Sequence, residues 1–407
     1  MLTLLILHYA NTYMDRVSLA AVAPLIRAEF QIDHVAMGVV FSAFSIPYAL
    51  SQIPVGRMAD RFGSRRVLTV IVSLWSVLTM AVAVCWDRVS LAVCRFLFGA
   101  AQGGAFPTAS RAVTNWFPEE RRGFVQGVTH TGARLAGAAT PPVVVLFATW
   151  GGWRFPFLIL GGLGLLWAWF WYREFRDHPT DHPKQGLTAA RKEAAGGTTL
   201  PWGRLLRNRN VWALNAMYFC YVYAFWIYIT WFPSYLAEGR GHPLQTAGVL
   251  AAAPLLAGAA ANTAGGILSD HCSLRWGLRR GRRWVGIGGF IATAALMVPA
   301  ALHEDAGVSL VLFTAAAVAL ESTTGASWAA AVDIGREDAG TVSGFMNTCG
   351  NLGGALSQLA FGWLVEATGR WTVPFLAAGG MCLAGALLWL CVDPERPAGG
   401  VGFAKHP

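Results

Sequence analysis

Long apolar runs, separated by short polar stretches, follow one another along almost the whole chain. Each run has roughly 20 to 28 residues, which is enough for a helix to cross a lipid bilayer. We expect helices in these runs because a membrane-spanning segment must satisfy its backbone hydrogen bonds internally. The pattern predicts an all-α membrane protein with twelve transmembrane helices, over residues 3–27, 35–57, 67–86, 89–114, 121–148, 154–173, 209–236, 243–269, 284–302, 307–332, 339–366 and 371–392.

The longest polar stretch divides these twelve segments into six and six. Residues 174–208 carry Pro179, Pro183, a Gly-Gly pair and scattered Lys and Arg, which is typical of a linker. We therefore predict a first six-helix bundle over 1–173, a cytoplasmic linker over 174–208, a second bundle over 209–392 and a cytoplasmic tail over 393–407.

An internal repeat supports this division. The segment RGFVQGVTHTGARLAGAA (122–139) aligns without gaps with AGTVSGFMNTCGNLGGAL (339–356), and their glycines largely coincide. Same-sense repeats of six helices predict two bundles related by a pseudo-twofold axis along the membrane normal. In such architectures the solute site lies between the bundles, near the membrane midplane.

Composition and charge agree with a membrane protein. The 407 residues are 55% hydrophobic and only 13% charged, and the mean hydropathy is +0.46. If both termini are cytoplasmic, about 22 of the 31 Lys and Arg lie on the cytoplasmic side, as the positive-inside rule requires. The net charge of +9 then reflects topology in the plasma (inner) membrane and gives no reason to expect nucleic acid. The seven cysteines show no disulfide or metal-site spacing, and the first apolar run shows no separable signal peptide.

Asp15 and Arg16 lie side by side within the first apolar run. Full charges at bilayer depth are costly and usually serve a solute or ion pathway. We therefore expect a binding site here, with each residue as the other's first partner. An inert ion pair that joins two helices is the alternative.

The repeated segment carries further polar pairs. His130 and Arg134 are four residues apart and so share one helix face, and Asn347 and Asn351 occupy the equivalent positions of the second half. We expect these four side chains to face a solute, although the two asparagines also fit a role as hydrogen bonds between helices. Arg134 has no carboxylate in its own segment and is expected to need an anion.

The predicted spans contain no lysine, and away from their ends they carry arginine at positions 16, 95, 111 and 134. A guanidinium offers bidentate donors to a carboxylate, which an ammonium does not. We expect Arg95 to support the site, and Arg111, nearer the cytoplasmic end of its span, to order a gate.

The loop after the second span, Gly56-Arg57-Met58-Ala59-Asp60-Arg61-Phe62-Gly63-Ser64-Arg65-Arg66, resembles the signature loop of the major facilitator superfamily. The resemblance covers essentially the whole chain. Further motifs resemble its anion:cation symporter branch, which includes galactonate and hexuronate transporters, sialin and vesicular glutamate transporters. These motifs are Asp15-Arg16, Arg95-Phe96-Leu97-x-Gly99, Trp116-Phe117-Pro118 and Gly350-Asn351-Leu352-Gly353-Gly354.

The resemblance implies roles for individual residues. In sugar-acid transporters of this branch, the arginine matching Arg16 holds the substrate carboxylate, and tyrosines matching Tyr13 and Tyr48 help to line the pocket. Residues matching Ser327 and Trp328 form a polar and aromatic wall, and one matching Asn347 reads substrate hydroxyls. The tyrosines and the tryptophan equally fit ordinary packing. Residues Gly56, Arg57, Asp60 and Arg61 are expected to form a gate.

Two positions depart from the pattern of the branch. Gln102 stands where many members have a glutamate implied in proton coupling, and Arg134 stands where galactonate-type carriers have a glutamine. Because an amide cannot carry a proton, we expect any coupling to run through Asp15 with help from Glu321. Glu321 could instead form a structural pair.

Together these features predict a monomeric secondary transporter of a small organic anion, which is a sugar acid or another mono- or dicarboxylate. We expect proton-coupled symport by alternating access, without cofactor or metal. An exchanger or uniporter without proton coupling, a membrane anion sensor, a drug or cation exporter and a membrane enzyme are the alternatives. A sensor would carry a signalling domain, an exporter an acidic cavity and an enzyme a catalytic motif, and none of these is recognisable in the sequence.

Overall fold

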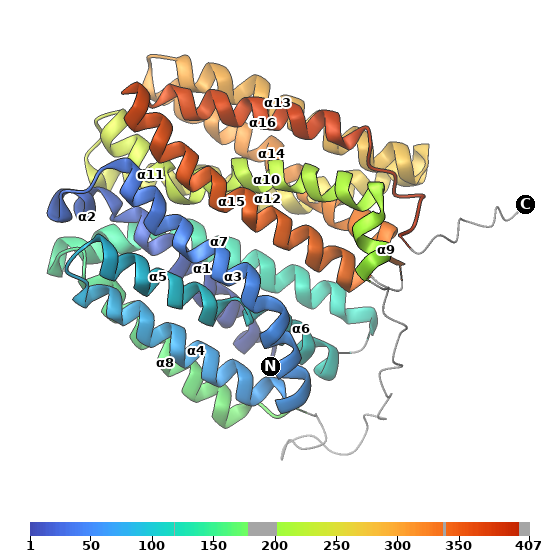
Figure 1. The fold of residues 1–407 in the computed structure, drawn as a ribbon, viewed down its shortest axis with the longest axis horizontal. Coiled ribbons are helices and arrows are strands. Elements are labelled where there is room, and N and C mark those ends of the chain that lie inside the picture. The colour runs from blue at the N-terminus through green and yellow to red at the C-terminus, as the bar shows by residue number, and fades with distance from the viewer. Residues whose placement is uncertain (118, 178–201, 337–338, 399–407) are drawn as a thin grey trace, which may run out of the picture. The chain divides into compact units, whose positions relative to one another are not determined.

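The computed structural model describes residues 1–117, 119–177, 202–336 and 339–398 (Figure 1), and all regular structure in them is helical. The side chains of a few helical residues, including Asp60, lie outside the described part. So do residues 178–201 of the predicted linker and 399–407 of the predicted tail.

The first half of the chain contains a series of helices joined by short turns. They are α1 (Leu2–Ala21), α2 (Ala23–Phe30), α3 (His34–Phe62), α4 (Ser64–Ala81), the short η1 (Val82–Val84), α5 (Arg88–Gln102), α6 (Ala105–Trp116), α7 (Glu119–Gly151) and α8 (Phe155–Glu174). The second half continues with α9 (Trp202–Arg207), α10 (Arg209–Thr230), α11 (Phe232–Ser234), the π-helix η3 (Tyr235–Gly239), α12 (Leu244–Trp276), α13 (Leu278–Leu302), α14 (Ala306–Gly335), α15 (Ala339–Thr368) and α16 (Thr372–Trp389).

Ten candidate spans in the described residues are long and apolar enough to cross a membrane, and they match ten of the twelve predicted segments. The first and eleventh predicted segments also form long helices, α1 and α15, but these are not among the ten. Charged and amide side chains in α1 and the glycines and asparagines of α15 lower their apolar character. The number of twelve membrane-crossing helices therefore stays a prediction, in which α1 and α15 would be the two most polar helices.

The contacts divide the chain into two compact units. One comprises Met1–Ala194 and Phe232–Ala252, and the other comprises Ala195–Trp231 and Ala253–Pro407. The segment Phe232–Ala252 thus packs within the first unit, although it follows α10 in the sequence. The predicted bundle boundaries and the pseudo-twofold axis stay predictions.

Helix pairs distant in sequence build the first unit, with α1 against α7, α3 against α5, and α4 against α8. The α3–α5 contact is backbone to backbone: a Cβ atom on Gly99 would lie 2.2 Å from the Phe44 carbonyl oxygen, and one on Gly103 would lie 2.3 Å from that of Tyr48. The predicted fourth span breaks into α5 and α6 at Gly103 and Gly104.

In the second unit α13 packs against α14 and α16, and α10 against α15. Here too glycines allow close approach, since a Cβ on Gly265 would lie 2.0 Å from the Ser322 carbonyl oxygen.

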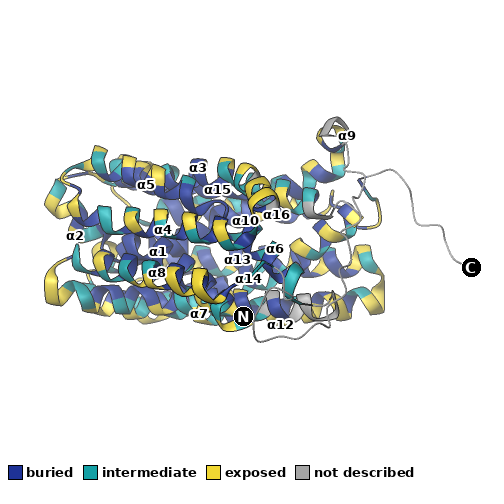
Figure 2. Cartoon of the chain, turned by 90° about the horizontal axis from the view of Figure 1, so that it is seen from below, coloured by how far each residue is buried: buried dark blue, intermediate teal, exposed yellow. Residues whose placement is uncertain are grey.

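Exposed apolar residues are grouped along single faces of the helices. Figure 2 shows buried and exposed residues on different sides of single helices, and α4 exposes Val70, Leu74 and Val77, one per turn. These are the faces expected to contact lipid.

Candidate functional site

The most unusual feature of the first unit is a buried guanidinium surrounded by aromatic rings. Arg16 of α1 is only 8% exposed, and its guanidinium carbon lies 4.4 Å from the ring centroid of Tyr48. The rings of Phe106, Phe44 and Tyr13 lie 5.2, 5.4 and 5.6 Å from the same atom. All four distances are within the range in which an aromatic ring attracts a cation. The predicted pocket tyrosines thus both contact Arg16.

Arg16 has a neutral hydrogen-bond partner. Its Nε donates to Oε1 of Gln102 at 2.6 Å, and Nε2 of Gln102 donates to the backbone carbonyl of Thr12 at 3.3 Å. Gln102 is completely buried, and its place is set by the close α3–α5 contact at Gly99 and Gly103. Nη2 of Arg16 is buried and has no hydrogen-bond partner. One nitrogen of this guanidinium therefore still has hydrogen-bonding capacity, which an anion could use.

The expected pairing of Asp15 with Arg16 is wrong. No ion pair joins these two described side chains, and Asp15 accepts instead from Nδ2 of Asn11 at 3.3 Å. The reason is helical geometry, because neighbouring residues project about 100° apart around the axis and do not face each other. The carboxylate is 2% exposed, and its Oδ1 has no hydrogen-bond partner.

Arg95 lies on the same side of the first unit as Arg16. It is 5% exposed, and its guanidinium carbon is 4.8 Å from the Phe98 ring centroid and 5.2 Å from that of Phe44. Phe44 therefore contacts both guanidinium groups, and the two arginines share an aromatic wall. This arrangement is compatible with the predicted supporting role, which stays a prediction.

His130 and Arg134 both lie on α7, as predicted. The His130 ring is 5.1 Å from that of Tyr9 and 6.0 Å from that of Phe106, so it adjoins the aromatic wall around Arg16. His130 is exposed and Arg134 is half-buried. A direct role of either in binding stays a prediction.

The predicted gate residues lie at the end of α3 and on α6. Arg57 and Arg61 are exposed, and Arg61 lies 5.3 Å from the Phe62 ring. A Cβ on Gly56 would contact Pro107 of α6 at 3.5 Å, and Arg111, on the same helix, is half-buried. Because the Asp60 side chain lies outside the described part, the gate itself stays a prediction.

The second unit contains a separate polar cluster around Glu321 of α14, which is 3% exposed. Its Oε1 accepts from the Tyr221 hydroxyl at 3.2 Å, and its Oε2 accepts from Nδ2 of Asn262 at 3.1 Å and from Oγ1 of Thr324 at 3.4 Å. Gly258 leaves room for the Glu321 side chain, since a Cβ on Gly258 would lie 2.8 Å from Cγ of Glu321. Helices α10, α12 and α14 thus converge on one buried carboxyl group.

The remaining predicted residues of the second unit have internal partners. Ser327 is buried and donates to the Thr323 carbonyl at 2.9 Å, which is a bond within its own helix. Nε1 of Trp328 donates to the Tyr218 hydroxyl at 3.0 Å, and the Trp328 side chain is 38% exposed. Nδ2 of Asn351 donates to the Asn347 carbonyl at 2.8 Å. These residues lie on α14 and α15, but contact with a solute stays a prediction.

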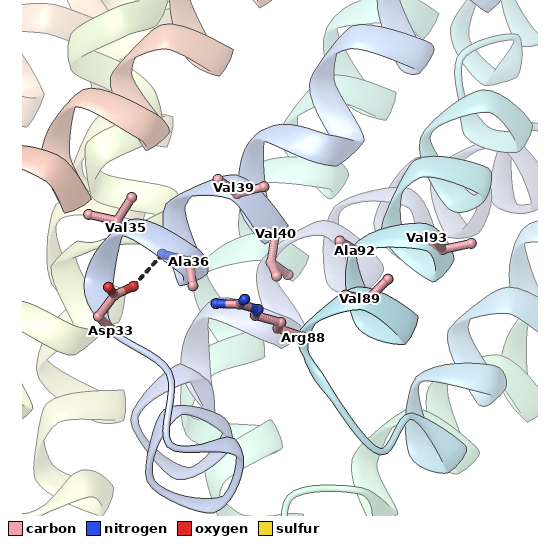
Figure 3. Close-up of a pocket in the computed structure, with 9 residues that line it drawn as sticks. All are labelled: Asp33, Val35, Ala36, Val39, Val40, Arg88, Val89, Ala92 and Val93. Carbon is pink, nitrogen blue, oxygen red and sulfur yellow. Dashed lines mark hydrogen bonds between the residues drawn. The ribbon is translucent and has the colours of Figure 1, made fainter.

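A cavity of about 380 Å³ lies elsewhere in the first unit, between the starts of α3 and α5 (Figure 3). Its lining consists mainly of valine and alanine with Asp33 and Arg88, and it includes none of the predicted site residues. Val39, Val89 and Val93 are about half exposed, so this cavity opens on an outer helix face. Among the described residues no cluster of His, Cys, Asp and Glu has the geometry of a metal site.

Several contact residues were missed from the sequence. Phe44 and Phe106 complete the aromatic wall, and Tyr221 and Asn262 hold Glu321. One signal was present, because Phe44 and Tyr48 are four residues apart and so share a helix face. The others come from different helices, and no spacing along the chain links them.

This fold defines a multi-pass helical membrane protein, and comparison with known proteins gives its family. The chain matches the Major Facilitator Superfamily over residues 4–358 and 279–406, and it belongs to that family. It is 39% identical to the Probable sulfoacetate transporter of Cupriavidus necator, over 98% of this chain and 96% of the relative. It is 31% identical to the Hexuronate transporter of Bacillus subtilis, over 92% and 90% of the two chains.

A solved structure shows the same fold. A bacterial homolog to the human lysosomal transporter Spinster, in an inward-facing and occupied conformation, superposes with a TM-score of 0.79 and 18% identity over 96% of each chain. The family match and the named relatives confirm the predicted superfamily and the predicted resemblance to sugar-acid transporters of its anion:cation symporter branch, and they confirm that the chain is a transporter and not an enzyme.

Proposed function

We propose that this protein is a secondary active transporter of a small organic anion, which works by alternating access. The observation that carries the proposal is Arg16, a buried guanidinium with an open Nη2 in an aromatic wall. Leaving this charge without a carboxylate partner is costly unless an anion arrives to compensate it. The relatives indicate the class of anion, since they are named as transporters of sulfoacetate and of sugar acids.

The surroundings of Arg16 favour a compact substrate. Four aromatic rings line the guanidinium, and Gln102 already uses its amide on Arg16 and Thr12. A long polyhydroxylated acid needs many hydrogen-bonding groups, because each buried hydroxyl without a partner costs binding energy. A short sulfonate or carboxylate needs mainly the cation. We therefore rank a two-carbon sulfonate such as sulfoacetate ahead of a hexuronate.

The coupling proposal is proton symport, with Asp15 and Glu321 as proton carriers. Both are buried carboxyl groups in long helices, one in each unit, and Glu321 has three hydrogen-bond donors around it. The second candidate is anion exchange or uniport. Gln102 favours it, because a neutral partner on Arg16 neither competes with the substrate nor takes up a proton when displaced.

The test has a binding step and a transport step. Purified protein is screened by thermal shift with sulfoacetate, glucuronate, galactarate and malate, and the best ligand is then measured for uptake into proteoliposomes. We expect stabilisation by sulfoacetate, uptake of it, and loss of both in Arg16→Lys. Arg88→Lys, at the exposed start of α5, is the matched control and keeps both.

The outcomes separate the alternatives. Uptake driven by an inward proton gradient supports symport, whereas uptake that needs a counter-anion inside supports exchange. Binding without any uptake identifies a membrane anion sensor. Unchanged binding in Arg16→Lys refutes the proposed site. A monomer in the plasma (inner) membrane with both termini cytoplasmic completes the proposal, and accessibility labelling of terminal tags tests the orientation.

A further inference from the structure

Three charged or titratable side chains from separate segments meet away from the Arg16 site. The Glu238 carboxylate of η3 accepts hydrogen bonds from Arg27 of α2 and, at 3.0 Å, from Nε2 of His34 at the start of α3. Nη2 of Arg27 also lies 3.3 Å from Nδ1 of His34. The three side chains are 15%, 14% and 26% exposed for Arg27, His34 and Glu238. Such partly buried, mutually bonded charges bind more firmly than an exposed surface pair.

The cluster is important because Glu238 lies in a segment whose chain neighbours belong to the second unit. The segment Phe232–Ala252 belongs to the first compact unit by its contacts, but both of its ends are bonded directly to the second unit, at Trp231 and at Ala253. A relative movement of the two units must therefore act on this segment. It either moves with α2 and α3 or separates from them.

The segment and its docking site both contain unusual backbone. Tyr235–Gly239 is a π-helix, a rare form that often marks functional positions, and Gly241 follows with a φ of +71°. In the docking site, Gln31 directly follows α2 and has a φ of +52°, a left-handed conformation that is uncommon for a residue other than glycine. Backbone of this kind needs support from neighbouring contacts. Glu238 belongs to the π-helix, and Arg27 and His34 precede and follow Gln31 in the sequence. The cluster therefore joins these two stretches of unusual backbone.

The cluster lies at the opposite end of α3 from the signature loop. His34 begins α3 and Gly63 follows its end, and a helix of 29 residues is about 43 Å long. This length spans a bilayer core of about 30 Å. If the signature loop is cytoplasmic, the cluster is on the outer side of the membrane.

We propose that Glu238, Arg27 and His34 form a latch that holds the segment Phe232–Ala252 on the first unit, and that this latch opens when the transporter opens to the outer side. The proposal rests on alternating access as the proposed function. The latch acts through docking of this segment, and its test needs no anion.

Burial raises the pKa of Glu238, but the hydrogen bond from His34 and the charge of Arg27 outweigh this and hold it below its ordinary value. The carboxylate therefore stays ionised at neutral pH, and its contribution is lost only as the pH falls through this lowered pKa.

The other titratable groups nearby have separate partners. Glu29 of α2 accepts from the Trp153 indole and from Arg154, both at 2.7 Å. Asp33 accepts from the Ala36 amide at 2.7 Å, and Nε of Arg240 donates to the Tyr235 hydroxyl at 2.6 Å. His242 follows in the same segment, and its backbone amide donates to the Leu236 carbonyl.

Hydrogen exchange of the purified full-length protein, without substrate, tests the latch. We expect Glu238→Gln to raise the exchange rate of the backbone amides in residues 232–243 at least fivefold relative to wild type. Glu29→Gln, which alters a neighbouring ion pair on the same helix, is the matched control and leaves that rate unchanged. A charge swap, Arg27→Glu with Glu238→Arg, should recover most of the protection and so separates pairing from a folding defect.

The latch is refuted if residues 232–243 of Glu238→Gln exchange at the rate seen in Glu29→Gln. Because no ligand is present, failure here is distinct from failure of the proposed anion site.

Discussion

The neutral partner of Arg16 is the feature whose alteration should be most informative. Gln102→Glu is nearly isosteric and replaces the acceptor Oε1, 2.6 Å from Nε of Arg16, by a carboxylate oxygen. Two unit charges about 4 Å apart attract each other by about 4 kcal/mol at an effective dielectric constant of 20. An incoming anion has to compete with that attraction. Desolvation of the new carboxylate offsets part of it, so we expect a loss of at least about 1.4 kcal/mol, or tenfold in affinity.

The same substitution should create proton linkage. In the unliganded variant the carboxylate is stabilised in its ionised form by Arg16, and the bound anion removes that stabilisation. Substrate binding should therefore be accompanied by proton uptake. At pH 8, where the proton is scarce, the loss of affinity should be greatest, and it should diminish towards pH 6.

Calorimetry in two buffers of different ionisation enthalpy measures both the affinity and the number of protons taken up. Sulfoacetate is the first probe, because its sulfonate stays ionised throughout this range. Gln102→Met is the matched control: it removes the hydrogen bond but adds no charge, and should weaken binding without adding pH dependence. An affinity of Gln102→Glu within twofold of wild type at pH 8, with unchanged proton uptake, would refute the assignment of Arg16 as the anion site.

Three further predictions concern other parts of the molecule. Arg134→Gln should lower the rate of anion uptake at least fivefold at unchanged expression; equal uptake would remove Arg134 from the site. Gly103→Ala should destabilise the protein by about 1–3 kcal/mol in thermal unfolding, because its Cβ would lie 2.3 Å from the Tyr48 carbonyl oxygen, and an unchanged midpoint would contradict that packing. Asp60→Asn should slow uptake while substrate affinity falls by less than tenfold; a variant that no longer binds would place Asp60 in the site and not in a gate.

The membrane-spanning helices could be predicted from the sequence, because crossing a bilayer imposes a length and an apolar composition on each segment. Ten predicted spans are found as candidate spans, and the family was recognisable from the loop between the second and third. Arg16 was identifiable for the same reason. A charge in an apolar run is visible from one segment alone, whatever its neighbours are.

What the charges contact was decided by the tertiary structure. Asp15 was expected to pair with Arg16 because the two are adjacent in sequence, but helix geometry separates adjacent side chains, and the partner of Arg16 comes from α5. That partner reaches Arg16 because glycines of α5 lie against the α3 backbone. Likewise, Glu238 packs with α2 and α3, more than 200 residues earlier in the chain. The sequence by itself determined which segments are apolar enough to cross a membrane and which charges they carry, since both depend on local composition. Only the packing of distant helices decided which groups compensate those charges.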